Sequence, residues 1–148
     1  MTTTVLTRAV ARLLLAPVLM VAAAVLVKGY ADVGDGFAAG VIAALGVLLQ
    51  YLAFGRAAVE QALPVRRAAQ LAVGGLLLAL AVAFPPVLGG GAPLQHAPAP
   101  GDEVVKLGSL ELIGAVAFDV GVFALVLGMV VATIGLIAGT REEEAGRP

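Results

Sequence analysis

The chain contains no cysteine and no tryptophan, and its single histidine is His96. Without cysteine it has no thiolate ligands, and one histidine does not build a metal site by itself. A formal net charge of −1 offers no basic surface for nucleic acid, so we expect no nucleic-acid partner. The sequence also lacks a phosphate-binding glycine loop with its lysine, a paired nucleophile and base, and a multi-histidine cluster. We therefore expect no bound cofactor, no metal site and no enzymatic reaction.

Charged residues are scarce, and apolar residues are abundant. Of 148 residues, 13% are charged and 61% hydrophobic, against about 25% charged and 45–50% apolar in ordinary soluble domains. The apolar residues are mainly Ala, Leu, Val and Gly, and small residues let helices approach closely in lipid. This composition predicts an all-α membrane protein in contact with the lipid bilayer.

Four apolar segments approach the roughly 20 residues needed to cross a ~30 Å hydrocarbon core. They cover about 10–27, 37–54, 68–88 and 110–138. Pro17 interrupts the first segment, and Pro85 with Pro86 should end or bend the third. The last is long enough to tilt in the membrane. We therefore predict one membrane domain over residues 1–148 with four transmembrane helices.

The first segment also has some features of a cleaved signal peptide. Arg8 and Arg12 precede its apolar run, and three consecutive alanines at 22–24 offer small residues for cleavage. The apolar run continues past these alanines to Val27, however, so we predict a span that is retained.

The distribution of Lys and Arg predicts the orientation of the four helices. The N-terminus, the connection at 55–67 and the tail at 139–148 together carry seven of these residues, whereas the other two connections carry only Lys28 and Lys106. Both termini are therefore predicted in the cytoplasm of a multi-pass protein of the cell membrane. The connection at 89–109, rich in glycine and proline, is then an irregular outer loop.

Glycines recur at regular intervals in two of the predicted helices. Gly114, Gly121, Gly128 and Gly135 form a seven-residue repeat in the last segment, and Gly36, Gly40 and Ala44 follow one another at four-residue spacing in the second. Glycine is common in membrane helices, so chance is one explanation. We favour the alternative that these residues form seams on which partner helices pack closely.

Asp119 is an acidic residue inside the last apolar segment. It lies nine residues after Leu110, which places it about 13 Å into the predicted helix and near the middle of the membrane. Because an acid there costs at least ~2.5–3.5 kcal/mol on insertion scales, it should face protein or a water-filled cavity. It lies about 200° around the helix from Gly121, so it points away from the glycine seam.

Two consequences follow for Asp119. If the seam contacts one neighbour and Asp119 another, the helix needs protein on two sides, and we expect subunits beyond this chain to supply it. The carboxyl group is then either part of an ion path or a polar bond that only holds helices together, and the sequence gives both readings equal weight.

Other polar residues in or near the spans have a functional and a structural reading. Thr133 lies fourteen residues after Asp119 and nearly on its face, so it either extends a polar stripe or, as we favour, packs in the core. Gln50 and Tyr51 are expected to be interfacial anchors or to bond between helices.

Several charged residues lie where helices are expected to begin. Asp35 is expected to cap the start of the second helix, and the Lys28 side chain is expected to extend to the membrane interface. The alternative, which we favour less, is that the two residues line an ion entrance. Ser109 and Glu111 fit a cap and a first-turn acid at the start of the last helix.

Two segments together resemble a known family. Residues 28–55, KGYADVGDGFAAGVIAALGVLLQYLAFG, and residues 114–128, GAVAFDVGVFALVLG, are similar to the MnhB/MrpB-type subunit of multisubunit cation/proton antiporters. That family has GH-x-x-PGGGF-x-x-G before a helix ending in YLAFG, and FD-x-GV in its last helix. By this resemblance, the first motif corresponds to Gly34, Gly36, Phe37 and Gly40. The second motif corresponds to Phe118, Asp119, Gly121 and Val122. Three positions depart from the pattern, with Tyr30 in place of His, Val33 in place of Pro and Asp35 in place of Gly.

The resemblance implies a non-catalytic subunit in the membrane arm of an antiporter that exchanges cytoplasmic Na⁺ for external H⁺. Its partners would be other membrane subunits of a hetero-oligomeric complex, with Asp119 in an ion path shared between them. One alternative is the equivalent subunit of an energy-converting membrane-bound hydrogenase or a related redox-driven cation pump. Another is a purely structural scaffold.

Overall fold

The computed structural model of the chain describes residues 4–28, 35–88, 106–107, 110–111 and 114–145. Its elements in order are α1 (Val5–Lys28), α2 (Gly36–Phe54), α3 (Arg56–Ala62), the 3-10 turn η1 (Val65–Arg67), α4 (Ala68–Ala83), α5 (Pro85–Leu88), β1 (Lys106–Leu107), β2 (Leu110–Glu111) and α6 (Gly114–Ala145). Four stretches are long and apolar enough to cross a membrane: α1, α2, η1 with α4, and α6 as far as Thr140. The predicted helical protein with four long apolar helices is confirmed.

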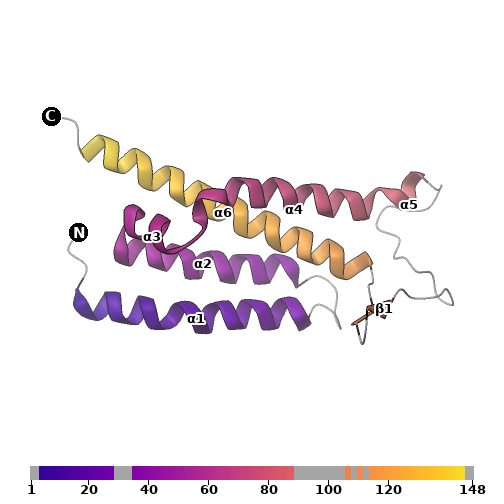
Figure 1. Cartoon of the computed structure of the whole chain (residues 1–148), viewed down its shortest axis with the longest axis horizontal. Helices are drawn as coiled ribbons and strands as arrows, with labels where there is room; N and C mark the ends of the chain where they lie inside the picture. The colour runs from indigo at the N-terminus through magenta and orange to yellow at the C-terminus, as the bar shows by residue number, and fades with distance from the viewer. Residues whose placement is uncertain (1–3, 29–34, 89–105, 108–109, 112–113, 146–148) are drawn as a thin grey trace.

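The four long helices lie side by side in the order α1, α2, α6, α4 (Figure 1). The last helix of the chain therefore lies between the second and the fourth, while α1 packs mainly on α2. At one end of this row α1 and α4 end and α2 and α6 begin; we call it the Lys28 end. We call the opposite end, where α1 begins and α3 follows α2, the arginine end after Arg8, Arg12 and Arg56.

The two proline sites behave differently. Helix α1 is continuous through Pro17, so the predicted interruption of the first span is wrong; membrane helices tolerate proline because neighbouring groups compensate for the lost backbone bond. Helix α4 instead ends at Ala83, and the four-residue α5 begins at Pro85. Pro85 and Pro86 have no backbone N–H to continue the hydrogen bonds of α4, so the predicted break in the third segment is observed.

Two helix boundaries differ from the expected ones. Helix α1 begins at Val5 rather than near residue 10. Helix α6 begins at Gly114 rather than 110, because residues 110–111 pair antiparallel with 106–107 in a short hairpin. Glu111 therefore lies in a strand, and its predicted place in the first helical turn is wrong, while Ser109 lies outside the described residues. Helix α6 also continues to Ala145, into the segment expected to be a tail.

A buried hydrogen bond joins α1 to α2. The Gln50 side chain donates from Nε2 to the Ala11 carbonyl oxygen over 2.7 Å, and Gln50 and Ala11 are 5% and 0% exposed. One turn further along α2, the guanidinium of Arg12 lies 5.3 Å from the centre of the Phe54 ring, a cation–π distance. The interhelical bond expected for Gln50 is therefore present, and it fixes the register of α1 on α2.

Replacing Gln50 by leucine is expected to destabilise the chain by about 0.6 kcal/mol, the average measured for interhelical hydrogen bonds in membranes. The Ala11 carbonyl would lose a buried donor while the size of the side chain is kept. Unfolding by a denaturing detergent in mixed micelles measures the change. Gln70→Leu is the matched control, because Gln70 is exposed on α4. Equal effects of the two substitutions would contradict a specific role for the buried bond.

Candidate functional site

Glycines on α6 and α4 bring these two helix backbones into direct contact. A Cβ atom added at Gly121 would lie 2.8 Å from the Ala79 nitrogen and 2.9 Å from the Gly75 carbonyl oxygen. One added at Gly128 would meet the backbone of Ala68 and Ala72 in the same way. Close approach of this kind is what small residues permit between membrane helices. Gly121 and Gly128 therefore lie on the α4 side of α6.

The glycines of α2 lie against the other side of α6. A Cβ atom added at Gly36 would lie 2.9 Å from the Asp119 carbonyl carbon and 3.0 Å from its Cα. One turn along, a Cβ at Gly40 would lie 2.9 Å from the Val126 Cβ and 3.0 Å from the Phe123 carbonyl oxygen. The first turns of α2 thus rest directly on α6 at Asp119.

The seven-residue repeat does not follow a single neighbour. Gly135 lies near the Tyr51 hydroxyl of α2, 3.4 Å from where its Cβ would be, and not against α4. Gly114 is the first residue of α6 and is partly buried. A straight α-helix drifts about 20° per heptad against a seven-residue repeat. The glycines of α6 therefore divide between two partner helices along its length.

Asp119 is buried, with 4% of its surface exposed. Its backbone lies against Gly36 of α2, whereas Gly121 lies against Gly75 of α4, so the two residues lie on opposite sides of α6. Helix α6 is thus covered on both sides by helices of its own chain. Because α6 lies between α2 and α4, the coverage of its two sides does not by itself require additional subunits.

The position of Asp119 along α6 also differs from expectation. It lies five residues into α6, about 7.5 Å from the helix start. The apolar part of α6, Gly114–Thr140, has 27 residues and is therefore about 40 Å long. Asp119 therefore lies nearer the start of α6 than the nine residues expected, because residues 110–111 pair with 106–107 and the helix begins at Gly114. Asp119 lies near the Lys28 end, level with the first residue of α2.

An ion pair lies at the same end. Lys28 Nζ is 3.3 Å from Asp35 Oδ2, and the two side chains are 65% and 29% exposed. Asp35 occupies the N-cap position of α2, but within the described residues its side chain makes no capping hydrogen bond. Because Gly36 follows Asp35 directly and rests on the Asp119 backbone, the Lys28–Asp35 pair and Asp119 lie at the same end of the helix row. No group of three possible metal ligands occurs among the residues described.

Thr133 is not part of this group. Its hydroxyl donates to the Met129 carbonyl oxygen over 2.8 Å, within α6, and the side chain is exposed. Fourteen residues separate it from Asp119, about 21 Å along the helix. The predicted core packing is wrong, since threonine in a membrane helix can satisfy its hydroxyl on its own backbone and face outward.

A second charged cluster, at the arginine end, was missed in the sequence. Arg56 Nε lies 2.5 Å from Glu60 Oε1, and Arg66 Nε lies 3.3 Å from Glu60 Oε2. The hydrogen bond from Arg56, aided by the charges of Arg56 and Arg66, lowers the pKa of the Glu60 carboxyl below its usual value. The four-residue spacing of Arg56 and Glu60 on a helix is the signal that could have found it.

The lowered pKa of Glu60 predicts a pH dependence. A carboxyl whose pKa is lower in the folded state stabilises that state above its unfolded pKa, and the contribution is lost as pH falls through the folded value. We expect the protection of the α3 amides, which is the slowing of their exchange relative to the intrinsic rate at the same pH, to decrease as the pH falls below about 4. Hydrogen exchange followed by mass spectrometry measures this. In the Glu60→Gln variant the pH-dependent step should be absent; an unchanged step would show that another group controls α3.

Four apolar helices with a buried carboxylate at a contact between two of them define a multi-pass membrane protein with an acid held between its spans. Residues 6–132 match a family described as "Domain related to MnhB subunit of Na+/H+ antiporter". The chain belongs to the MnhB family, and the resemblance of its two motifs to that family is confirmed. Members of this kind are transporter components and not catalytic enzymes.

Two relatives show how much of the chain is shared. Over 112 residues it is 35% identical to a probable K⁺/H⁺ antiporter protein of the A/B type from Rhizobium meliloti (strain 1021), covering 76% of this chain and 11% of that protein. Over 110 residues it is 32% identical to the B-type component of a Na⁺/H⁺ antiporter from Alkalihalophilus pseudofirmus, covering 74% of this chain and 75% of the relative. The chain thus spans about a tenth of the first relative and three quarters of the second.

Proposed function

We propose that this chain is the B-type component of a multisubunit cation/proton antiporter that exchanges a monovalent cation, Na⁺ in the first instance, for H⁺. The family description and one relative name Na⁺, and the other relative names K⁺. The relative that names Na⁺ is covered over three quarters of its length, which favours this cation. The partners would be the other membrane subunits of the complex.

One observation supports a place in the ion path. The two family motifs lie about 80 residues apart in the sequence, and they meet where Gly36 rests on Asp119. This contact surrounds with protein an acid that a span would otherwise expose to lipid, and acids held in membrane spans commonly serve proton or cation pathways. Lys28 and Asp35 lie at the same end, and we assign them to the entrance of this path.

The proposed orientation defines which side this entrance faces. Seven of the nine Lys and Arg residues belong to the N-terminus, the connection at 55–67 and the tail, which favours the cytoplasm for the arginine end. The Lys28 end then faces outward, and Asp119 would receive protons from the external side. Thr133, at a different level of α6, has no place in this path.

Vesicles from cells that express the complete complex, with and without this chain, test the proposal. We expect addition of Na⁺ to release a preformed pH gradient only when the chain is present, as reported by a pH-sensitive dye. Unchanged exchange in its absence would overturn the proposal. A response to K⁺ and not to Na⁺ would show that K⁺ is the exchanged cation. Coupling that requires electron donors would instead favour the hydrogenase-like alternative.

A further inference from the structure

We propose that a groove between α1 and α4 binds one acyl chain of an anionic phospholipid, with the lipid phosphate held by Arg67. The groove has a volume of about 370 Å³, and four helices contribute to its wall. Leu15 and Leu19 come from α1, Leu71 from α4, and Leu127 and Val131 from α6. We call it the lipid groove. It opens where α1 and α4 flank the central helices α2 and α6 without packing on each other.

The lining and size of the lipid groove fit a hydrocarbon chain. Of the residues that line it, Arg67 is the charged one. An apolar cavity of about 150 Å³ accommodates benzene, so a groove of about 370 Å³ has room for several methylene groups of an acyl chain.

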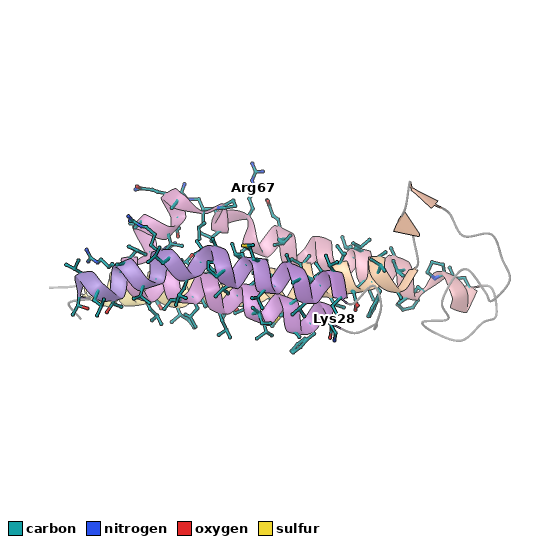
Figure 2. The ribbon with its side chains drawn as sticks, turned by 90° about the horizontal axis from the view of Figure 1, so that it is seen from below. Lys28 and Arg67 are labelled. Carbon is teal, nitrogen blue, oxygen red and sulfur yellow. The ribbon has the colours of Figure 1, made fainter. Side chains whose placement is uncertain are left out.

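Arg67 supplies the charge that selects the lipid. Figure 2 shows its side chain projecting from one face of the helix row, and it lies just before the first residue of α4. The neighbouring carboxylate of Glu60 is shared between Arg56 and Arg66, and no acidic partner of Arg67 occurs within the described residues. A guanidinium binds phosphate in two-pronged geometry, and basic pockets between membrane helices bind anionic head groups.

The position of Arg67 favours an anionic partner. It shares the lipid groove with Leu15 and Leu19, which lie more than two turns into α1. Figure 1 shows the same offset, since α4 begins part-way along α6. A charged side chain beside apolar helices is costly unless an anion or water meets it. From Arg67 the groove runs past Leu71 toward the Lys28 end, so a phosphate on Arg67 leaves the acyl chain pointing into the membrane.

Native mass spectrometry of the purified full chain with equal amounts of phosphatidylglycerol and phosphatidylcholine, identical in their acyl chains, tests the proposal. One arginine near the membrane surface should favour the anionic lipid about fivefold. Arg67→Gln is expected to remove this preference, and Arg66→Gln, the same change of charge one residue away, to keep it. Equal retention of both lipids by the unmodified chain, or equal effects of the two variants, would overturn the assignment.

A second pair of variants tests the acyl chain. Leu71→Trp fills the lipid groove and is expected to lower phosphatidylglycerol retention, whereas Leu77→Trp, on a residue that is 61% exposed and outside the groove, is expected to leave it unchanged. If Leu71→Trp leaves phosphatidylglycerol retention unchanged, the proposed position of the acyl chain in the lipid groove is overturned.

The assembled complex provides the last test. Because the sequence has no cysteine, Leu71→Cys gives this chain one thiol for a photoactivatable cross-linker, and the same labelling of membranes without the substitution identifies products that come from other proteins. A covalent adduct with lipid is the expected product. A cross-link to a neighbouring protein of the complex would show that another subunit, and not a lipid, occupies the groove. This result would overturn the proposal.

Discussion

Replacing Gly75 by valine is expected to separate α4 from α6, whereas valine at the adjacent Gly74 is expected to leave the two helices packed. A Cβ atom at Gly75 would overlap the Leu125 backbone nitrogen and lie 2.6 Å from the Gly121 carbonyl oxygen. These are helix backbone atoms, which cannot rotate aside as a flexible side chain can. Overpacking of a tight contact costs about 1–3 kcal/mol and occasionally more. This contact lies at the centre of the largest interhelical interface, so we expect the upper part of that range.

Gly74 provides a closely matched control. The two glycines are neighbours in one helix, yet a Cβ atom at Gly74 would have no atom within 4 Å. Alanine at Gly74 is expected to be neutral or to stabilise α4 by up to about 1 kcal/mol, because glycine has the lower helix propensity. Denaturing-detergent titration of the four variants, alanine and valine at each site, measures the difference. Comparable destabilisation at both positions would show that helix propensity rather than interhelical contact controls stability here.

These two glycines show what the sequence reveals and what it does not. The regular spacing in α6 predicted close helix contacts, and Gly121 and Gly128 lie in one. Gly74 and Gly75, however, look alike in the sequence, and only the rotation of α4 about its axis decides that one meets α6 and the other has open space beside it. All faces of these helices are similarly apolar, since lipid and a partner helix favour the same residues. The order α1, α2, α6, α4 could therefore not be predicted from hydrophobic patterns.

The site was predicted in part for a related reason. Asp119 stood out because an acid in an apolar run is rare, and its position opposite Gly121 followed from helix geometry alone. Its contact with Gly36 did not follow, because periodicity gives the face of a residue and not the helix opposite. The start of α6 was predicted four residues too early, because two-residue strands such as 106–107 and 110–111 leave almost no pattern in a sequence.

The Asp119→Asn variant is expected to reduce cation/proton exchange to the level of vesicles that lack this chain, while the complex still assembles. Asparagine has nearly the same size, and Gly36 contacts the backbone of residue 119, so the junction of α2 and α6 is kept. The amide does not ionise, and thus neither carries a proton nor attracts a cation by charge. Exchange in vesicles, with assembly followed by native electrophoresis, measures the two effects separately.

The comparison with Asp35 makes the result specific. Asp35→Asn removes one negative charge at the same end of the molecule, but the Asp35 side chain is 29% exposed and paired with Lys28. Exposed ion pairs contribute little energy, so we expect a small decrease in exchange rather than its loss. Asp119→Ala separates the remaining roles, because it removes both the charge and the polar atoms. If the Asn and Ala variants at 119 both transport at the normal rate in an intact complex, Asp119 serves only to hold helices together and the chain is a scaffold.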